Sequence, residues 1–249
     1  MLADRIALVT GAANGIGRAT ALCLAQEGAD VAIVDLESYR LDTLAAEITA
    51  LGRRALPMAL DCTDEAAVTA AHDAIIAAFG RIDILFNNVG QSARERSTEF
   101  WQSSPATWDF VLNVSLRAAM LWSRQVVGAM RARCSGKIVN MSSESAFFGD
   151  TGLVDYAAAK MGVVGFTRAL ARELAPFQVN VNVVAPGAIA TRAHDRLPAA
   201  VITRIKESTP IGFIGTPEDV AHTVAFLASD KSRFITGQTI LIDGGRWMI

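Results

Sequence analysis

Cysteine is scarce in this 249-residue chain, and its three copies, Cys23, Cys62 and Cys134, stand far apart. The sequence contains no C-x-x-C pair and no cluster of Cys with His. It therefore lacks both the ligand spacings typical of zinc sites and the regular spacing of a disulfide framework. We expect no metal, and three reduced cysteines that serve as small apolar side chains.

An excess of one charge is also lacking. Lys and Arg together number 23, Asp and Glu number 25, and the formal net charge is -2. Domains that bind nucleic acid usually carry a basic excess, so we expect no nucleic-acid partner. No apolar run reaches the ~18 residues that cross a bilayer, and we expect no membrane partner. Because 1–10 lack the basic and apolar regions of a signal peptide, we expect a cytoplasmic protein.

What the sequence does contain is an alternation of short apolar runs with longer amphipathic stretches. The apolar runs predict strands at 5–10, 30–35, 55–60, 82–87, 136–142, 178–184 and 238–242. The amphipathic stretches predict helices at about 15–28, 38–51, 64–79, 106–131, 153–174 and 217–229. The strands are apolar on both faces, as in a parallel sheet that is covered on both sides. We predict one α/β domain over 1–249, a doubly wound, Rossmann-like sheet of seven parallel strands.

A glycine-rich turn with the pattern G-x-x-x-G-x-G joins the first strand to the first helix. Glycines let the backbone turn tightly and approach a pyrophosphate, and the helix N-terminus presents free N–H groups and a positive dipole end. The place of the turn, after strand one and before a helix, favours a dinucleotide site over an empty turn. The residues that we expect to contact the dinucleotide here are Gly11, Asn14, Gly15, Ile16 and Gly17.

An acid ends the second strand: Asp35 is followed by Leu36. A carboxylate at this strand tip can accept hydrogen bonds from both hydroxyls of the adenosine ribose, and it would repel a 2′-phosphate. The glycine-rich turn has no Lys or Arg before Gly17 that would neutralise such a phosphate. We therefore predict NAD(H), rather than NADP(H), as the cofactor.

Polar and small residues follow the third and fourth strands at the same predicted sheet edge. Carboxyl ends of parallel strands bind ligands in open sheets of this kind, although Asx and Gly are also common in plain turns. Because these residues occur in series, we expect them to line the adenine-to-ribose part of the site. They are Asp61, Cys62, Asn88, Val89 and Gly90.

Tyr156 and Lys160 form a Tyr-x-x-x-Lys pair on one helix face, and Ser143 ends a strand upstream of them. The glycine-rich turn, the run 87–90, Asn113 and the Pro186-Gly187 pair accompany this set in order. Together these motifs resemble the short-chain dehydrogenase/reductase family. The resemblance covers nearly the whole chain, as far as the closing stretch 240–245.

The resemblance implies a role for each of the four polar side chains. Tyr156 would be the general acid/base for the hydroxyl or carbonyl oxygen, and Lys160 would hold the nicotinamide ribose and lower the phenol pKa. Ser143 would hydrogen-bond the substrate oxygen. Asn113 would hold a water that links Lys160 to solvent. The reaction implied is hydride transfer between nicotinamide and a secondary alcohol or ketone.

The turn after the sixth predicted strand completes the resemblance on the nicotinamide side. Here the family packs the turn against the nicotinamide ring and fixes the ring face that donates hydride, which the pattern implies to be the pro-S face. The residues that we expect to contact the cofactor are Pro186, Gly187, Ile189 and Thr191.

The substrate side is less defined, and we expect the irregular segment 188–210 to form a lid over it. Arginines suit an anionic substrate group, since a guanidinium pairs with a carboxylate through two hydrogen bonds, although surface pairing with Glu95 or Glu99 is the alternative. Phe147 and Phe148 suggest an apolar component. The candidate substrate residues are Ser143, Ser145, Phe148, Arg94, Arg192 and His194, with Arg96 as a further arginine of the same loop.

Two other functions fit part of this pattern. A 3-oxoacyl-(acyl-carrier-protein) reductase would share every motif, but Asp35 counts against it because biosynthetic reductases mostly take NADPH. A non-catalytic dinucleotide sensor or scaffold would typically lack the Tyr or the Lys, and both are present. By resemblance we expect a homotetramer, built through the long helices at about 106–131 and 153–174 and aided by small residues such as Gly162.

Overall fold

A seven-stranded parallel sheet forms the centre of the computed structural model, which describes residues 1–191 and 199–248. The strand order is β3-β2-β1-β4-β5-β6-β7, and every pair is parallel. The strands are β1 Ile6–Thr10, β2 Asp30–Asp35, β3 Ala55–Ala59, β4 Ile84–Asn87, β5 Gly136–Met141, β6 Val179–Pro186 and β7 Thr239–Ile242. The predicted Rossmann-like fold is confirmed, and each predicted strand matches an observed one to within two residues at either end.

Burial on both faces explains why these strands could be read from the sequence. All residues of β1, β4 and β6 are buried, whereas the edge strands β3 and β7 are only partly buried. Alternate residues of β1 belong to two different apolar clusters: Ala7 and Val9 face one, and Leu8 faces the other. A strand with apolar neighbours on both sides must be apolar throughout.

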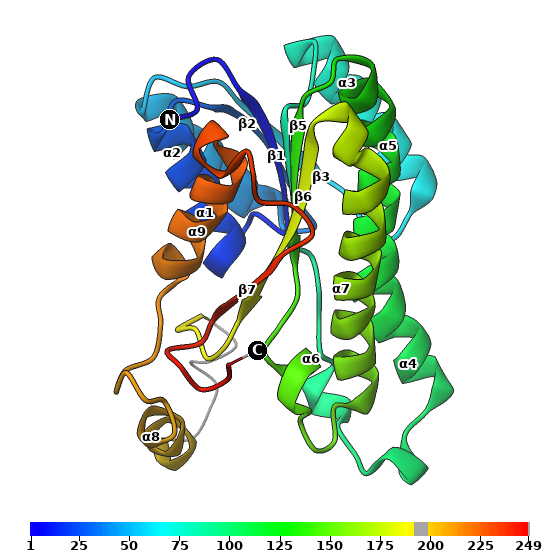
Figure 1. Ribbon diagram of the computed structural model, residues 1–249, viewed down its shortest axis with the longest axis vertical. Coiled ribbons are helices and arrows are strands. Elements are labelled where there is room, and N and C mark those ends of the chain that lie inside the picture. The colour runs from blue at the N-terminus through cyan, green and yellow to red at the C-terminus, as the bar shows by residue number, and fades with distance from the viewer. Residues whose placement is uncertain (192–198, 249) are drawn as a thin grey trace.

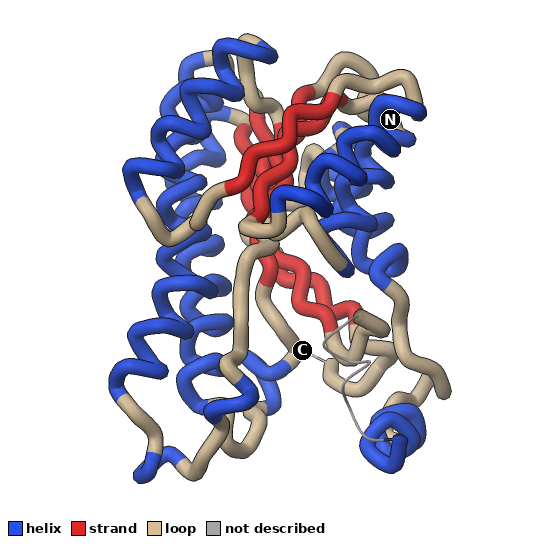
Figure 2. The backbone as a smooth tube through the Cα atoms, turned by 180° about the vertical axis from the view of Figure 1, so that it is seen from behind, coloured by secondary structure: helices blue, strands red, loops and turns tan. Residues whose placement is uncertain are grey.

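Helices cover both faces of the sheet (Figure 1). One face carries α1 Gly15–Gln26, α2 Ser38–Ala50 and α9 Pro217–Ala228, and the other carries α3 Glu65–Phe79, α5 Ala118–Ala132 and α7 Val154–Leu174. The view from behind shows the same three layers (Figure 2). Among the described residues, no helix is long and apolar enough to span a bilayer.

Two predicted elements differ from the structure. The single helix expected at 106–131 is divided into α4 Pro105–Leu112, a π-helical turn at Asn113–Arg117, and α5. The π turn inserts one extra residue into the helix and rotates the side chains that follow it. The segment expected to be irregular, 188–210, contains the helix α8 Ala199–Glu207. A short helix, α6 Ser145–Phe148, also forms directly after β5.

The sheet topology places all the motifs at one edge. The chain passes from β1 outward to β2 and β3, and then returns to β4 on the other side of β1. The carboxyl ends of β1 and β4 therefore flank a topological switch point, where open α/β sheets bind their ligands. The glycine-rich turn, α6 and the C-terminal residues all follow strands at this edge, which is the lower end of the sheet in Figure 1.

Candidate active site

The glycine-rich turn has the geometry of a pyrophosphate cradle. Gly11 and Gly15 adopt positive φ angles of 64° and 49°, which side-chain-bearing residues rarely adopt. A Cβ atom at Gly17 would lie 2.0 Å from the carbonyl oxygen of Gly11, so only glycine fits there. The first turn of α1 carries no acidic residue that would compete with a phosphate for its free N–H groups. The described residues therefore fit the diphosphate of a dinucleotide.

Asn88 holds this turn in shape from the neighbouring strand end. Its Nδ2 donates to the carbonyl oxygens of Thr10 at 3.1 Å and Gly11 at 3.0 Å, and its backbone N–H donates to the Thr10 hydroxyl at 3.0 Å. Asn88 thus supports the cofactor loop, and its contact with the cofactor stays a prediction.

Asp35 lies beside the glycine-rich turn, as its place at the tip of β2 predicted. Its Oδ2 accepts a hydrogen bond from the Ala13 N–H at 3.0 Å, and its Oδ1 accepts one from the Leu36 N–H at 2.7 Å. These bonds fix the carboxylate at the switch-point edge. The Leu36 side chain beside it is exposed.

The residues after β3 are engaged within the protein. Asp61 accepts hydrogen bonds from the backbone and hydroxyl of Thr63, both at 2.8 Å. The Cys62 side chain is buried in the core, and burial raises the pKa of its thiol to about 12. A cofactor contact by Cys62 would therefore have to come from its backbone.

Tyr156, Ser143 and Lys160 converge at the carboxyl end of β5. The Lys160 ammonium lies 5.7 Å from the centre of the Tyr156 ring and donates to the Met141 carbonyl at 2.9 Å. Ser142 is not part of this group, because its hydroxyl donates to the Lys160 carbonyl at 2.8 Å. The spacing to Tyr156 in the sequence also favours Ser143 over Ser142.

The electrostatics of the two central groups follow from burial. Burial raises the pKa of the Tyr156 phenol, while the Ser143 hydroxyl beside it and the charge of Arg94 act in the opposite direction. Lys160 is only 2% exposed, and burial lowers its pKa to about 8. The lowering of the phenol pKa that the sequence predicts comes from the Lys160 ammonium together with the positive nicotinamide of bound NAD⁺, and it stays a prediction. The desolvation of the phenol outweighs the attractive charges around it.

Gly90 makes room for the lysine. A Cβ atom at Gly90 would lie 2.7 Å from the Lys160 Nζ and 3.3 Å from the Ser115 hydroxyl oxygen. Because Gly90 has no side chain, the motif at the end of β4 leaves space for the Lys160 side chain. Val89, which precedes it, packs against the core cluster around Leu8 and Trp122.

The turn after β6 closes the site against the glycine-rich turn. A Cβ atom at Gly15 would meet the Thr191 side chain at 3.2 Å, so the two turns lie against each other. Ile189 is buried and forms a bridge to Gly215. Gly187 leaves space for the Glu144 carboxylate, since a Cβ there would lie 2.7 Å from Glu144 Oε2. The predicted nicotinamide turn and phosphate turn are thus brought together.

Known proteins are similar to this chain over nearly its full length. The family described as enoyl-(acyl carrier protein) reductase matches residues 11–246. A (2S)-[(R)-hydroxy(phenyl)methyl]succinyl-CoA dehydrogenase subunit from Thauera aromatica is 42% identical over 98% of this chain and 96% of its own. A 3-oxoacyl-[acyl-carrier-protein] reductase from Thermotoga maritima is 40% identical over 98% of each chain.

The chain belongs to the short-chain dehydrogenase/reductase family. A solved structure of levodione reductase agrees, with a TM-score of 0.94, 34% identity and coverage of 99% of this chain and 98% of the other. Family membership makes the protein an oxidoreductase with a nicotinamide dinucleotide site.

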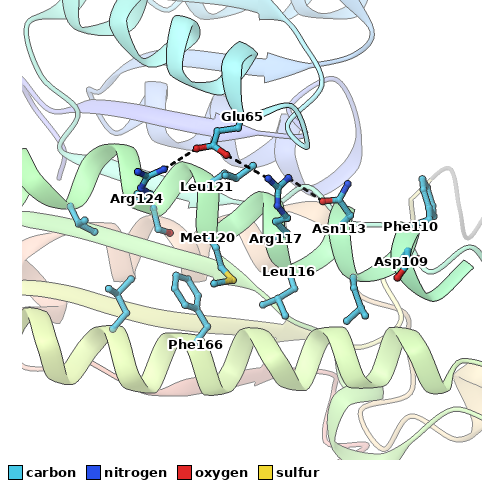
Figure 3. A pocket seen from close by; sticks show the side chains of 14 residues that line it. Glu65, Asp109, Phe110, Asn113, Leu116, Arg117, Met120, Leu121, Arg124 and Phe166 are labelled. Atoms are coloured by element: carbon cyan, nitrogen blue, oxygen red, sulfur yellow. Dashed lines mark hydrogen bonds and ion pairs between the residues drawn. The ribbon is translucent and has the colours of Figure 1, made fainter. Parts of the chain in front are cut away.

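Asn113 begins the π turn between α4 and α5, and its role of holding a water stays a prediction. Its side-chain oxygen accepts a hydrogen bond from Arg117 at 3.3 Å, in a groove on the outer surface of α4 and α5 (Figure 3). Ser115, which the sequence analysis did not single out, takes the inner position near Gly90 and Lys160. Its hydroxyl exchanges hydrogen bonds with the backbone of Gln91, both at 3.1 Å. Side chains two positions apart on a helix point to opposite faces, so the side chains of Asn113 and Ser115 lie on different sides of it.

The predicted substrate residues have different surroundings. Ser145 is buried and donates to Asp150 at 2.6 Å, so it braces the loop. Phe148 lies against Trp247, with ring centres 5.9 Å apart, while Phe147 packs into the apolar core. Arg192 and His194 lie outside the described residues.

The two arginines that follow β4 have different surroundings. Arg94 is exposed, and its charge acts on the Tyr156 phenol. Arg96 lies over the Phe110 ring at 5.3 Å and is 3.9 Å from Glu95. The alternative of surface pairing is therefore seen for Arg96, while Glu99 accepts from the Trp101 indole at 2.8 Å. No group of metal-binding side chains occurs among residues 1–191 and 199–248.

Proposed function

We propose that this protein is an NAD(H)-dependent oxidoreductase that interconverts a secondary alcohol and a ketone, with Tyr156 as general acid/base. The observation that supports it best is the convergence of the Tyr156 phenol with Ser143 and Lys160, at the edge that also holds the glycine-rich turn. The nicotinamide, when bound, supplies the hydride acceptor or donor. The protein groups then have to move one proton at the substrate oxygen.

The three side chains suit that task in the reductive direction. A phenol with a raised pKa is protonated at neutral pH and can donate its proton to the developing alkoxide. The Ser143 hydroxyl beside it can hydrogen-bond the same oxygen. Lys160, with a pKa of about 8, is largely an ammonium at neutral pH and stabilises negative charge on the phenol oxygen once the proton has left.

Cofactor preference follows from Asp35. We expect kcat/KM with NADH to exceed that with NADPH by about a hundredfold or more, because the fixed carboxylate would lie against the 2′-phosphate. The steady-state rates of wild type, Asp35→Ser and Asp42→Ser with both cofactors test this. Asp35→Ser should lower the ratio of kcat/KM with NADH to kcat/KM with NADPH. Asp42 is an exposed acid of α2, and Asp42→Ser should leave this ratio unchanged. A wild-type preference for NADPH would contradict the assignment.

A second candidate substrate class is a 3-oxoacyl thioester. The 40% identity to the Thermotoga maritima reductase favours it, and the Thauera aromatica relative fits both classes, because its name gives a secondary alcohol on an acyl-CoA thioester. The 40% identity to a cis-4-hydroxycyclohexanecarboxylate dehydrogenase from Sinomonas cyclohexanicum favours the alcohol/ketone class. Oxidation of NADH measured by absorbance, over a panel of ketones and 3-oxoacyl thioesters, separates the two. A protein that binds NADH but turns over neither class would be a sensor or scaffold.

On the substrate side we propose that Arg94 receives an anionic group. It is exposed near the phenol, and no ion pair to it occurs in the part of the chain that the structure describes. The Arg94→Ala substitution should therefore lower kcat/KM more for ketones that bear a carboxylate than for neutral ketones. Equal losses for both kinds of ketone would remove Arg94 from substrate binding.

The expected homotetramer has a candidate surface. A groove of about 1100 Å³ runs along α4, α5 and α7, and exposes apolar side chains that include Phe110, Leu112 and Met120 (Figure 3). Apolar surface of this extent is typical of subunit contacts. Gly162 does not contribute in the way predicted, because it faces Leu116 of the same chain. Light scattering that gave the mass of one chain would contradict the tetramer.

A further inference from the structure

The last residues of the chain fold back over the catalytic loop. Gly244 and Gly245 adopt φ angles of 67° and 85°, which reverse the chain directly after β7. The Asp243 carboxylate then accepts hydrogen bonds from the Gly245 N–H at 3.0 Å and the Trp247 N–H at 2.8 Å. This turn brings Arg246 and Trp247 to the loop that follows Ser143.

Arg246 and Glu144 form an ion pair across this junction. The Glu144 side chain is 8% exposed and that of Arg246 is 23% exposed, so the pair is shielded from solvent. The guanidinium carbon of Arg246 also lies 5.8 Å from the centre of the Phe148 ring. Phe148 in turn contacts Trp247 at 5.9 Å, with the two rings tilted by 52°. One charged contact and two ring contacts therefore fasten the C-terminal segment to α6.

Glu144 connects this contact to the reacting groups. It follows Ser143 directly, its backbone N–H donates to the Pro186 carbonyl at 2.9 Å, and its Oε2 lies against Gly187. That second oxygen is buried and has no hydrogen-bond partner among the described residues. The carboxylate thus touches the catalytic loop, the nicotinamide turn and the C-terminal segment together.

We infer that Glu144 and Arg246 are positioning residues that hold the C-terminal segment Asp243–Met248 against the catalytic loop, so that Phe148 and Trp247 form an apolar wall that selects substrates with a bulky apolar substituent. This inference rests on the proposed function, since it assigns the substrate side of the same site. Arg246 would then help to determine substrate specificity although it lies 102 residues from Glu144 in the sequence, and no sequence motif connects the two residues.

Stability alone is a weak explanation for this pair. A buried ion pair often contributes little to folding, because desolvation offsets the attraction. Burial raises the pKa of Glu144 to about 7 despite the opposing charge of Arg246, and the neighbouring acids Asp243 and Asp150 add to the rise. A carboxyl group whose pKa is raised by burial next to a catalytic serine is typical of a functional site.

The test compares substrates that differ only in the size of one substituent. We would measure KM and kcat for a methyl ketone and a phenyl ketone with NADH, using wild type, Arg246→Met, Arg246→Lys and Trp247→Ala. KM for the phenyl ketone should rise about tenfold in Arg246→Met and Trp247→Ala, and KM for the methyl ketone should change less than about twofold. Arg246→Lys, which keeps the charge, should recover part of the loss.

Two further measurements keep the result interpretable. Hydrogen exchange at the amides of 245–248 should be about tenfold faster or more in Arg246→Met than in wild type, whatever the activity. Arg5→Ala, which breaks an ion pair to Asp230 away from the site, should change neither exchange at 245–248 nor KM. Unchanged exchange and equal KM changes for both ketones would overturn the inference. A wild type without activity on any ketone would instead count against the proposed function, while exchange would still report on the Glu144–Arg246 contact.

Discussion

Replacing Tyr156 by Phe should lower kcat by about 10²–10⁴-fold, the range that general acid/base groups contribute. The variant loses one oxygen, and with it the phenol proton beside the Ser143 hydroxyl. The ring itself packs against Ala93, Val111 and Ala159, and these contacts remain. NADH binding, measured by fluorescence titration, should therefore stay within about threefold of wild type.

The chain offers a matched control for this substitution. Its other tyrosine, Tyr39, is 82% exposed on α2, so Tyr39→Phe removes the same oxygen far from the site. This variant should keep wild-type kcat and KM. If Tyr156→Phe also kept them, another group would have to supply the proton and the proposed mechanism would be wrong.

The second large effect is expected at the glycine-rich turn. Gly17→Ala places a methyl group where the Gly11 carbonyl oxygen lies at 2.0 Å and the Asn88 amide at 2.6 Å. The first neighbour is part of the turn and the second is the side chain that holds it, so the turn must open to admit the methyl group. We expect the Kd for NADH to rise about a hundredfold or more, because the backbone N–H groups of the opened turn would no longer all point toward the pyrophosphate.

A helical glycine without such neighbours serves as the control. No atom lies within 4 Å of a Cβ at Gly128 of α5, so Gly128→Ala should bind NADH normally and gain about 0.4–1 kcal/mol of stability. Calorimetric titration with NADH and thermal unfolding measure both effects. A Gly17→Ala protein that is folded and binds NADH as tightly as Gly128→Ala would refute the pyrophosphate site.

The sheet could be predicted because its residues obey one local rule. The central strands are mostly apolar and buried on two faces, and signals such as the Thr216-Pro217 start of α9, where a capping box forms, mark the helices. The cofactor turn follows from its glycines, whose positive φ angles the spacing suggested. These features depend on neighbours in the sequence, and the structure reproduces them.

The parts that the sequence could not indicate depend on distant contacts. Nothing in the sequence near Asn113 predicts the π turn, which has neither Pro nor Gly, and the Ser115 hydroxyl that this turn carries lies close to Gly90. The rise in the Tyr156 pKa comes from burial, which the Tyr-x-x-x-Lys spacing does not encode. The contact between Glu144 and Arg246 joins two ends of the chain that no motif connects.

The most direct test of the central claim follows the hydrogen itself. NADH that carries deuterium in the pro-S position at C4 is supplied to the wild-type protein with a ketone that it reduces, and the product alcohol is analysed by mass spectrometry and NMR. The account predicts that deuterium appears on the carbinol carbon in a one-to-one ratio with the NAD⁺ formed. An unlabelled alcohol, with the deuterium retained on NAD⁺, would contradict the assigned face, and no consumption of NADH with any ketone or acyl thioester would contradict the proposed activity.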